Sequence, residues 1–183
     1  MRALRRLTQN VFAFALLSGG IGPAAAQPAQ PAPPTPPQQT TATYQDWIVR
    51  CETRPGPPPL KTCEMVQFTQ VQGQAGVLTS IAIGRPVKGQ PLKIVVQVPI
   101  NVWLPANVQL TTGDKDPGLP ATYKRCVPAY CFADADIKDD VIRKLRSVTA
   151  SGKLQFKDAN QKDVALPVSF KGFGTAFDAL AKE

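Results

Sequence analysis

The sequence predicts a mainly β protein, a two-sheet β-sandwich with one or two short α-helices. Eight short segments are rich in β-branched and aromatic residues, and clusters of Gly, Pro and Asp separate them. Only two segments carry apolar residues at helical spacing. The four cysteines fall within the same part of the chain, as is typical of an exported domain held by disulfides.

Residues 1–26 have the three parts of a secretory signal peptide. They open with a basic region containing three arginines, continue with the apolar run VFAFALL and end in three alanines before Gln27. The apolar run is shorter than the roughly 20 residues that a spanning helix needs, and glycine and proline interrupt it. We therefore expect cleavage, a periplasmic or secreted bacterial protein, and no stable membrane insertion.

Residues 27–43 read QPAQPAPPTPPQQTTAT, with six prolines and neither a charge nor a large apolar side chain. Such a composition predicts a disordered linker in extended polyproline conformation. A docking peptide for a proline-recognising partner is the alternative. The remaining residues, 44–183, suffice for one domain with a real core.

The charge of the chain excludes one class of partner. Without the signal-peptide arginines, 18 basic and 13 acidic residues remain, a net charge of +5. These cations are dispersed and do not alternate with aromatic residues, so we expect no nucleic-acid binding.

The expected strands follow the chain in order. They are DWIVRC, TCEMVQFTQVQ, VLTSIAIG, LKIVVQVP, NVQLTT, ATYKRC, KLQFKD and VALPVSF. We expect KLQFKD to pair with VALPVSF through a turn at Asn160, and Pro167, which lacks an N–H donor, to lie on an edge strand or at a bulge. Trp103 lies in the most apolar run, IVVQVPINVWLP, and is expected in the core, with an exposed binding aromatic as the alternative.

Four cysteines, Cys51, Cys63, Cys126 and Cys131, allow three disulfide pairings. Local pairing, Cys51 with Cys63 and Cys126 with Cys131, is favoured because each pair flanks a turn-forming stretch. Zinc binding is disfavoured, since the chain has no histidine and neither pair has CxxC spacing. We expect no cofactor and no metal.

The strongest helix signal follows the second cysteine pair. Asp134 or Asp136 is the expected N-cap, the apolar residues from Ile137 to Val148 have helical spacing, and Gly152 follows the end. The same carboxylates, from Asp134 to Asp140, could instead hold calcium or serve a metal-dependent enzyme. A second short helix is expected at Phe173, Ala176, Phe177 and Leu180, where it would close the sandwich.

The chain resembles the invasion-associated locus B family of alphaproteobacterial exported proteins from Tyr44 to Leu180. The resemblance rests on DWIVRC, a second cysteine after a proline-rich loop, GVLTSIAIG, YKRCVPAYCFADADI and VALPVSFKGFGTAFDAL. It implies an immunoglobulin-like β-sandwich in the periplasm or cell envelope, with disulfides at the pairs named above. It also implies an association, in some pathogenic members, with invasion of host cells, and it brings no established enzymatic activity.

The residues and the resemblance together predict a non-catalytic envelope protein that binds a protein or glycan of the envelope or of a host, in host interaction or envelope maintenance. Without histidine there is no Ser-His or Cys-His pair, and no nucleotide-binding motif occurs. We expect the binding surface near the second cysteine pair, where Tyr123, Lys124, Arg125 and Tyr130 gather. The segment around Trp103 is the second candidate.

Overall fold

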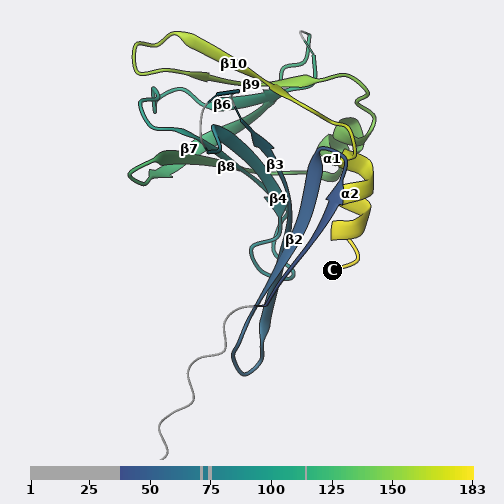
Figure 1. Cartoon of the computed structure of the whole chain (residues 1–183). Coiled ribbons are helices and arrows are strands. Elements are labelled where there is room, and N and C mark those ends of the chain that lie inside the picture. The colour runs from purple at the N-terminus through teal and green to yellow at the C-terminus, as the bar shows by residue number, and fades with distance from the viewer. Residues whose placement is uncertain (1–37, 71, 74–75, 114) are drawn as a thin grey trace, which may run out of the picture. The chain divides into compact units, whose positions relative to one another are not determined.

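The computed structural model describes residues 38–70, 72–73, 76–113 and 115–183, which form ten strands and two helices (Figure 1). The predictions for residues 1–37 lie outside this part of the chain. In order, the elements are β1 Gln38–Tyr44, β2 Trp47–Arg54, β3 Leu60–Thr69, β4 Thr79–Gly84, β5 Lys93–Pro99, β6 Val108–Thr111, β7 Leu119–Cys126, β8 Tyr130–Asp136, α1 Asp139–Arg146, β9 Gly152–Lys157, β10 Asp163–Val168 and α2 Phe173–Leu180.

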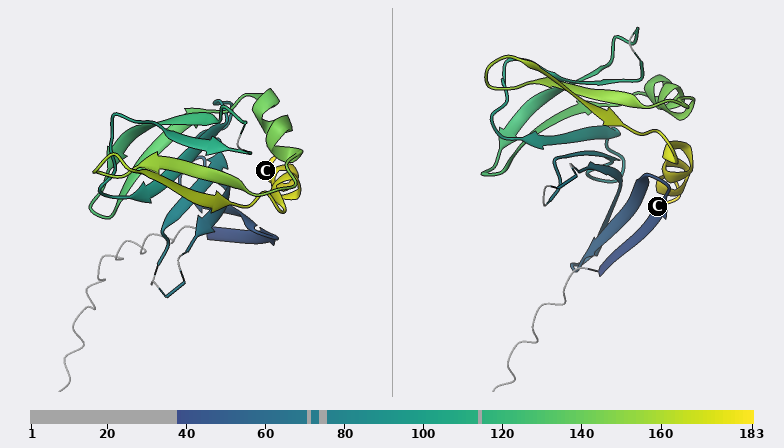
Figure 2. Two further views of the ribbon diagram at one scale, coloured as in Figure 1. Left: turned by 90° about the horizontal axis from the view of Figure 1, so that it is seen from above. Right: turned by 45° about the horizontal axis from the view of Figure 1, so that its top comes forward.

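The strands make two layers, and every described pairing between neighbouring strands is antiparallel. Hydrogen bonding follows the order β1-β2-β3-β4-β5-β8-β7-β6-β9-β10. β7 connects the layers, because Leu119 to Ala121 pair with β6 and the segment from Thr122 to Cys126 pairs with β8. The layer of β6, β9 and β10 thus folds over the layer that runs from β1 to β8 (Figures 1 and 2). This arrangement confirms the predicted β-sandwich.

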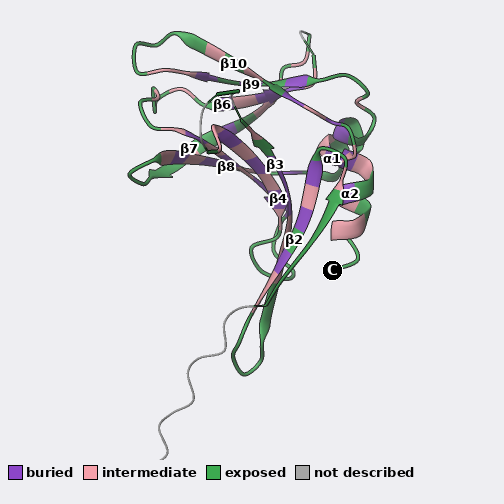
Figure 3. Ribbon diagram, in the orientation of Figure 1, coloured by how far each residue is buried: buried purple, intermediate pink, exposed green. Residues whose placement is uncertain are grey.

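The core lies between the layers and follows from the period of two along the strands. In β4, β5 and β9, alternate residues are buried (Figure 3). Ile83, Ile94, Val96 and Leu154 are at most 1% exposed. Burying each such side chain stabilises the fold by about 1.5–3 kcal/mol.

Helix α2 packs against the first strands of the sheet. The rings of Phe173 and Trp47 meet edge to face with centroids 5.1 Å apart, and the Trp47 indole N–H donates to the Ser169 carbonyl at 3.0 Å. Gly172 precedes the helix with φ of 81°, and a Cβ there would lie 2.0 Å from the Tyr44 carbonyl oxygen. Only glycine fits this close approach between the helix start and the β1–β2 turn.

The end of the predicted linker is a strand. Residues 38–43 belong to β1, which pairs with β2 along its whole length. The prolines stop at Pro37, and the following threonines and Tyr44 favour extended, sheet-forming backbone. The prediction that the linker continues to residue 43 is therefore wrong for its last six residues.

The predicted N-caps at Asp134 and Asp136 are also wrong. Both residues lie in β8, and α1 begins at Asp139 after an N-cap, Lys138, whose side chain makes no capping bond. β8 continues through them because they pair with Val95 and Lys93 on the neighbouring β5, and the Lys93 ammonium lies 3.2 Å from the Asp134 carboxylate and 2.7 Å from the Asp136 carboxylate. The hydrogen bonds to these two carboxylates raise the pKa of Lys93, and the bond to Asp136 contributes more than the bond to Asp134.

The C-terminal strands and helix of the sandwich confirm the predictions made from the sequence. β9 pairs with β10 along six residues, and the turn between them is held by the Asp158 carboxylate, which accepts from the backbone N–H groups of Asn160 and Lys162. β10 is the last strand in the order, so Pro167 lies on an edge strand as predicted. Helix α2 occurs where predicted.

Candidate functional site

Two disulfides hold the strands that carry the predicted site residues. Cys51 on β2 lies opposite Cys63 on β3, and Cys126 and Cys131 close the hairpin between β7 and β8. The favoured local pairing is therefore confirmed. A covalently closed hairpin presents its side chains with little loss of conformational freedom on binding.

The two tyrosines near the hairpin are turned toward the protein. The Tyr130 hydroxyl donates to the Val77 carbonyl at 3.1 Å, across β5, so this side chain is half-buried against the β3–β4 loop. Tyr123 is also half-buried, and its hydroxyl has no hydrogen-bond partner among the described residues. Burial raises the pKa of Tyr123 to about 12. Neither ring offers a fully exposed face to a partner.

The two cations of the hairpin are exposed but anchored. Lys124 lies 3.5 Å from the Asp134 carboxylate, and the Arg125 guanidinium lies over the Phe132 ring at 5.2 Å from its centroid. A β-bulge between Tyr123 and Arg125 places these two successive cations on the surface. Both side chains lie in a defined position next to the hairpin turn.

Trp103 is not in the core. It lies in the loop between β5 and β6, where its side chain is 38% exposed. The backbone N–H of Trp103 donates to the Lys157 carbonyl at 2.9 Å, and the neighbouring Val102 forms a β-bridge with Asp158. The loop is therefore attached to the end of β9. The expectation of a buried Trp103 is wrong because β5 ends at Pro99 and the chain leaves the sheet there.

Three further apolar side chains are exposed at the same end of the sheet. Ile100 is 42%, Leu104 is 52% and Val127 is 42% exposed. Pro99 pairs with Tyr130, and Tyr130 exchanges backbone hydrogen bonds with Val127, so the β5–β6 loop begins beside the hairpin turn. We call Ile100, Trp103, Leu104 and Val127 the tip patch.

Three of these four residues were not predicted from the sequence. Ile100, Leu104 and Val127 each stand directly beside a proline in the chain. Proline ends regular strand pairing, so a large apolar residue beside it is not held on the inner face of a sheet. A large apolar residue next to a proline was therefore the feature of the sequence that could have predicted this exposure.

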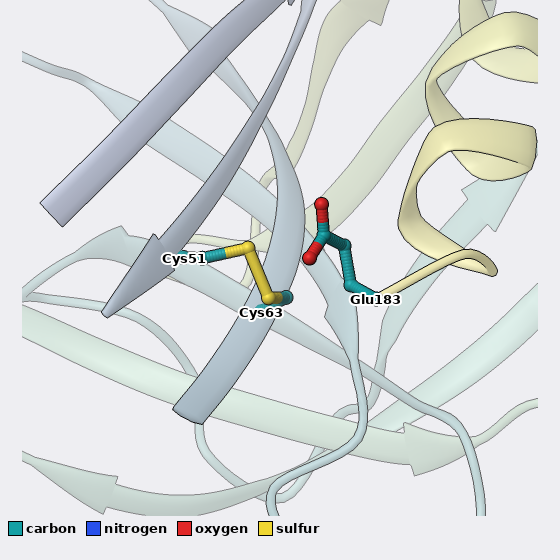
Figure 4. A group of neighbouring side chains, drawn as sticks. All are labelled: Cys51, Cys63 and Glu183. Carbon is teal, nitrogen blue, oxygen red and sulfur yellow. A yellow bond between two sulfur atoms is a disulfide. The ribbon is translucent and has the colours of Figure 1, made fainter. Parts of the chain in front are cut away.

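The carboxylates of the alternative metal site do not converge. Asp134 and Asp136 bind Lys93, whereas Asp139 and Asp140 lie in the first turn of α1. Within the described ranges, one group of potential metal ligands comes together, formed by Cys51, Cys63 and Glu183 (Figure 4). Its two sulfurs are bonded to each other, so neither is a thiolate that could bind a metal ion.

Comparison with known proteins gives one consistent family. The family model for the invasion associated locus B (IalB) protein matches residues 47–181. Two curated invasion protein B homologs, from Brucella abortus strain 2308 and from B. abortus biovar 1 strain 9-941, are each 29% identical over 138 residues, covering 75% of this chain and 77% of theirs.

A solved structure supports the fold. The crystal structure of invasion associated protein B from Bartonella henselae superposes with a TM-score of 0.66 at 22% identity, over 78% of this chain and 95% of that one. In the part of this chain that the structure describes, no helix is long and apolar enough to cross a membrane. The family match spans nearly all of the described residues, and the chain therefore belongs to the invasion associated locus B family.

Proposed function

We propose that this chain is a non-catalytic module of the bacterial cell envelope, located in the periplasm or secreted, that binds a protein or glycan through the tip patch. The observation that carries the proposal is that four large apolar side chains, each more than one-third exposed, lie on the β5–β6 loop and on the hairpin turn beside the start of that loop. Exposed apolar clusters on a soluble fold are typical of interaction sites.

The patch has the rigidity that recognition favours. The β5–β6 loop is fixed to β9 by the Trp103 backbone, and the disulfide Cys126–Cys131 closes the adjacent hairpin. Tryptophan is also among the residues that dominate binding energy at interfaces. A partner therefore meets a surface that loses little entropy on binding.

Charge beside the patch indicates the chemistry of the partner. Lys124 and Arg125 lie within three residues of Val127, about 10 Å along the strand. A partner with an apolar centre and acidic groups at its rim fits this arrangement. Binding to such a partner weakens as the salt concentration rises, because the charges at the rim are exposed.

The types and positions of the polar side chains support a non-catalytic role. The chain has no histidine, and its densest carboxylates are held in ion pairs with Lys93 or lie at the start of α1. The relatives are named as invasion proteins, which supports a partner in the envelope or on a host cell.

The test uses two pairs of exposed apolar residues. Leu104→Ser with Val127→Ser removes half of the tip patch, and Leu60→Ser with Val87→Ser removes similarly exposed side chains elsewhere (47% and 51%). After a partner has been isolated from envelope extract or a glycan array, its affinity is measured for both double variants. We expect at least a tenfold loss for the first pair and less than twofold for the second. Equal affinities for the two variants would refute the tip patch.

A further inference from the structure

A cavity of about 320 Å³ lies at the opposite end of β5 from the tip patch. Its walls come from three segments that are distant in sequence, namely the start of β3, the turn between β4 and β5, and the end of α2 with the residues that follow. Figure 4 shows the Glu183 carboxylate beside the Cys51–Cys63 disulfide at this place. This cavity is independent of the proposed partner surface.

One side of the cavity is apolar. Leu92, which is only 8% exposed, lines it together with the half-buried Phe177 and Leu180. Its volume corresponds to about ten water molecules at about 30 Å³ each. The space therefore suits a ligand of about ten non-hydrogen atoms whose body is aliphatic.

The rim of the cavity is positively charged. Lys61, Arg85 and Lys88 line it, against the single carboxylate of the Glu183 side chain. One N–H of the Arg85 guanidinium donates to the Gln90 carbonyl at 2.7 Å. The other N–H groups of this guanidinium can therefore bind a ligand. Lys88 makes no ion pair with any residue that the structure describes.

Lys61, the third cation of the rim, is already paired with a carboxylate. Lys61 forms an ion pair with the Glu183 side chain, whose carboxylate oxygen lies within 4.8 Å of both sulfurs of the disulfide. The site thus accepts this chemical group at its edge, while Arg85 and Lys88 leave a net positive charge for a second one.

We propose that this cavity binds a small aliphatic carboxylate, with its chain against Leu92, Phe177 and Leu180 and its head group at Arg85 and Lys88. Glu183 competes with the ligand by neutralising Lys61. The ligand is thus selected by two features together, an apolar chain of about seven carbons and a terminal carboxylate.

Octanoate, which has ten non-hydrogen atoms, is the probe. Titration calorimetry of the full chain should detect its binding, whereas acetate, which lacks the chain, and 1-octanol, which lacks the charge, should bind at least tenfold more weakly. Octanol binding as tightly as octanoate, or no binding of octanoate, would overturn the proposal.

Variants locate the site and give effects of opposite sign. Arg85→Gln with Lys88→Gln should weaken octanoate binding at least tenfold, and Glu183→Gln should strengthen it about threefold, because it frees Lys61. The charge-matched control Lys162→Gln with Lys171→Gln, both outside the cavity, should change it less than twofold. Glu183→Gln leaves the β4–β5 turn intact, so weaker or unchanged binding in this variant would overturn the proposal even if the arginine variant were unstable.

Discussion

Asp116 is a buried carboxylate that ties the β6–β7 loop to α1, and it offers a quantitative test of the structure. Its side chain is 6% exposed. It accepts hydrogen bonds from the Thr112 N–H and hydroxyl, both at 2.7 Å, from the Gly118 N–H at 3.0 Å, and from the Lys144 ammonium of α1. Burial alone would raise the pKa of Asp116, but the bonds from Lys144, Thr112 and Gly118 outweigh it and hold the pKa well below its usual range.

Replacing Asp116 should lower the free energy of unfolding by an amount that depends on the substitute. Asp116→Ala loses all four hydrogen bonds, and at about 1 kcal/mol of net stabilisation for each of three bonds the loss is about 3 kcal/mol. The fourth, to Lys144, adds little because the Lys144 side chain is 48% exposed. Asp116→Asn keeps an acceptor oxygen and should cost about 1–2 kcal/mol. Urea unfolding at pH 7 measures both losses.

The dependence on pH distinguishes the charge from the shape of the side chain. Because the folded-state pKa is depressed, the contribution of Asp116 is complete above the unfolded-state pKa of about 3.9 and is lost as the pH falls toward the folded-state value. The difference between wild type and Asp116→Asn should therefore shrink from pH 5 to pH 3. Asp163→Asn, at an ion pair whose aspartate is 87% exposed, should cost less than about 0.5 kcal/mol at any pH. A constant difference for Asp116→Asn down to pH 3 would show that the charge of the Asp116 carboxylate does not stabilise the fold.

Two further predictions concern stability. Removing the Cys51–Cys63 bond, which joins residues 12 apart, should cost about 3 kcal/mol, and removing the Cys126–Cys131 bond, which joins residues 5 apart, about 2 kcal/mol in the chain-entropy account. Urea unfolding of the paired serine variants checks this order, and the reverse order would contradict it. Gly172→Ala should destabilise far more than Gly73→Ala, because both have positive φ but only a Cβ at Gly172 meets backbone, 2.0 Å from an oxygen. Thermal unfolding compares them, with about 1 kcal/mol expected for Gly73→Ala, and equal losses would show that the contact at Gly172 is not tight.

Strands with one solvent-exposed face could be predicted because neighbouring residues in the sequence determine them. In β9, Leu154 and Phe156 alternate with lysine and glutamine, and the partner strand follows after a short turn. The pairing of these two strands was predicted from that pattern, and the edge position of Pro167 from its missing N–H donor. The disulfide pairing was similarly local, since each pair flanks its own turn.

The errors arose where distant residues decide the structure. Asp134 and Asp136 have the composition of a helix start, but both pair with β5, whose Lys93 is 41 residues from Asp134 and contacts both carboxylates. β1 has no apolar alternation of its own and forms by pairing with β2. The octanoate-sized cavity could not be predicted, because its walls meet only after the end of α2 packs near β3 and the β4–β5 turn.

We propose that a partner binds at the tip patch. The most direct measurement is photo-crosslinking in the bacterial envelope, with a photoreactive amino acid placed at Trp103 in one variant and at Val87, on the β4–β5 turn, in another. We expect a discrete crosslinked product from position 103 that disappears when Lys124 and Arg125 are both replaced by Ser, and no such product from position 87. A product from position 87 without one from position 103 would contradict the claim.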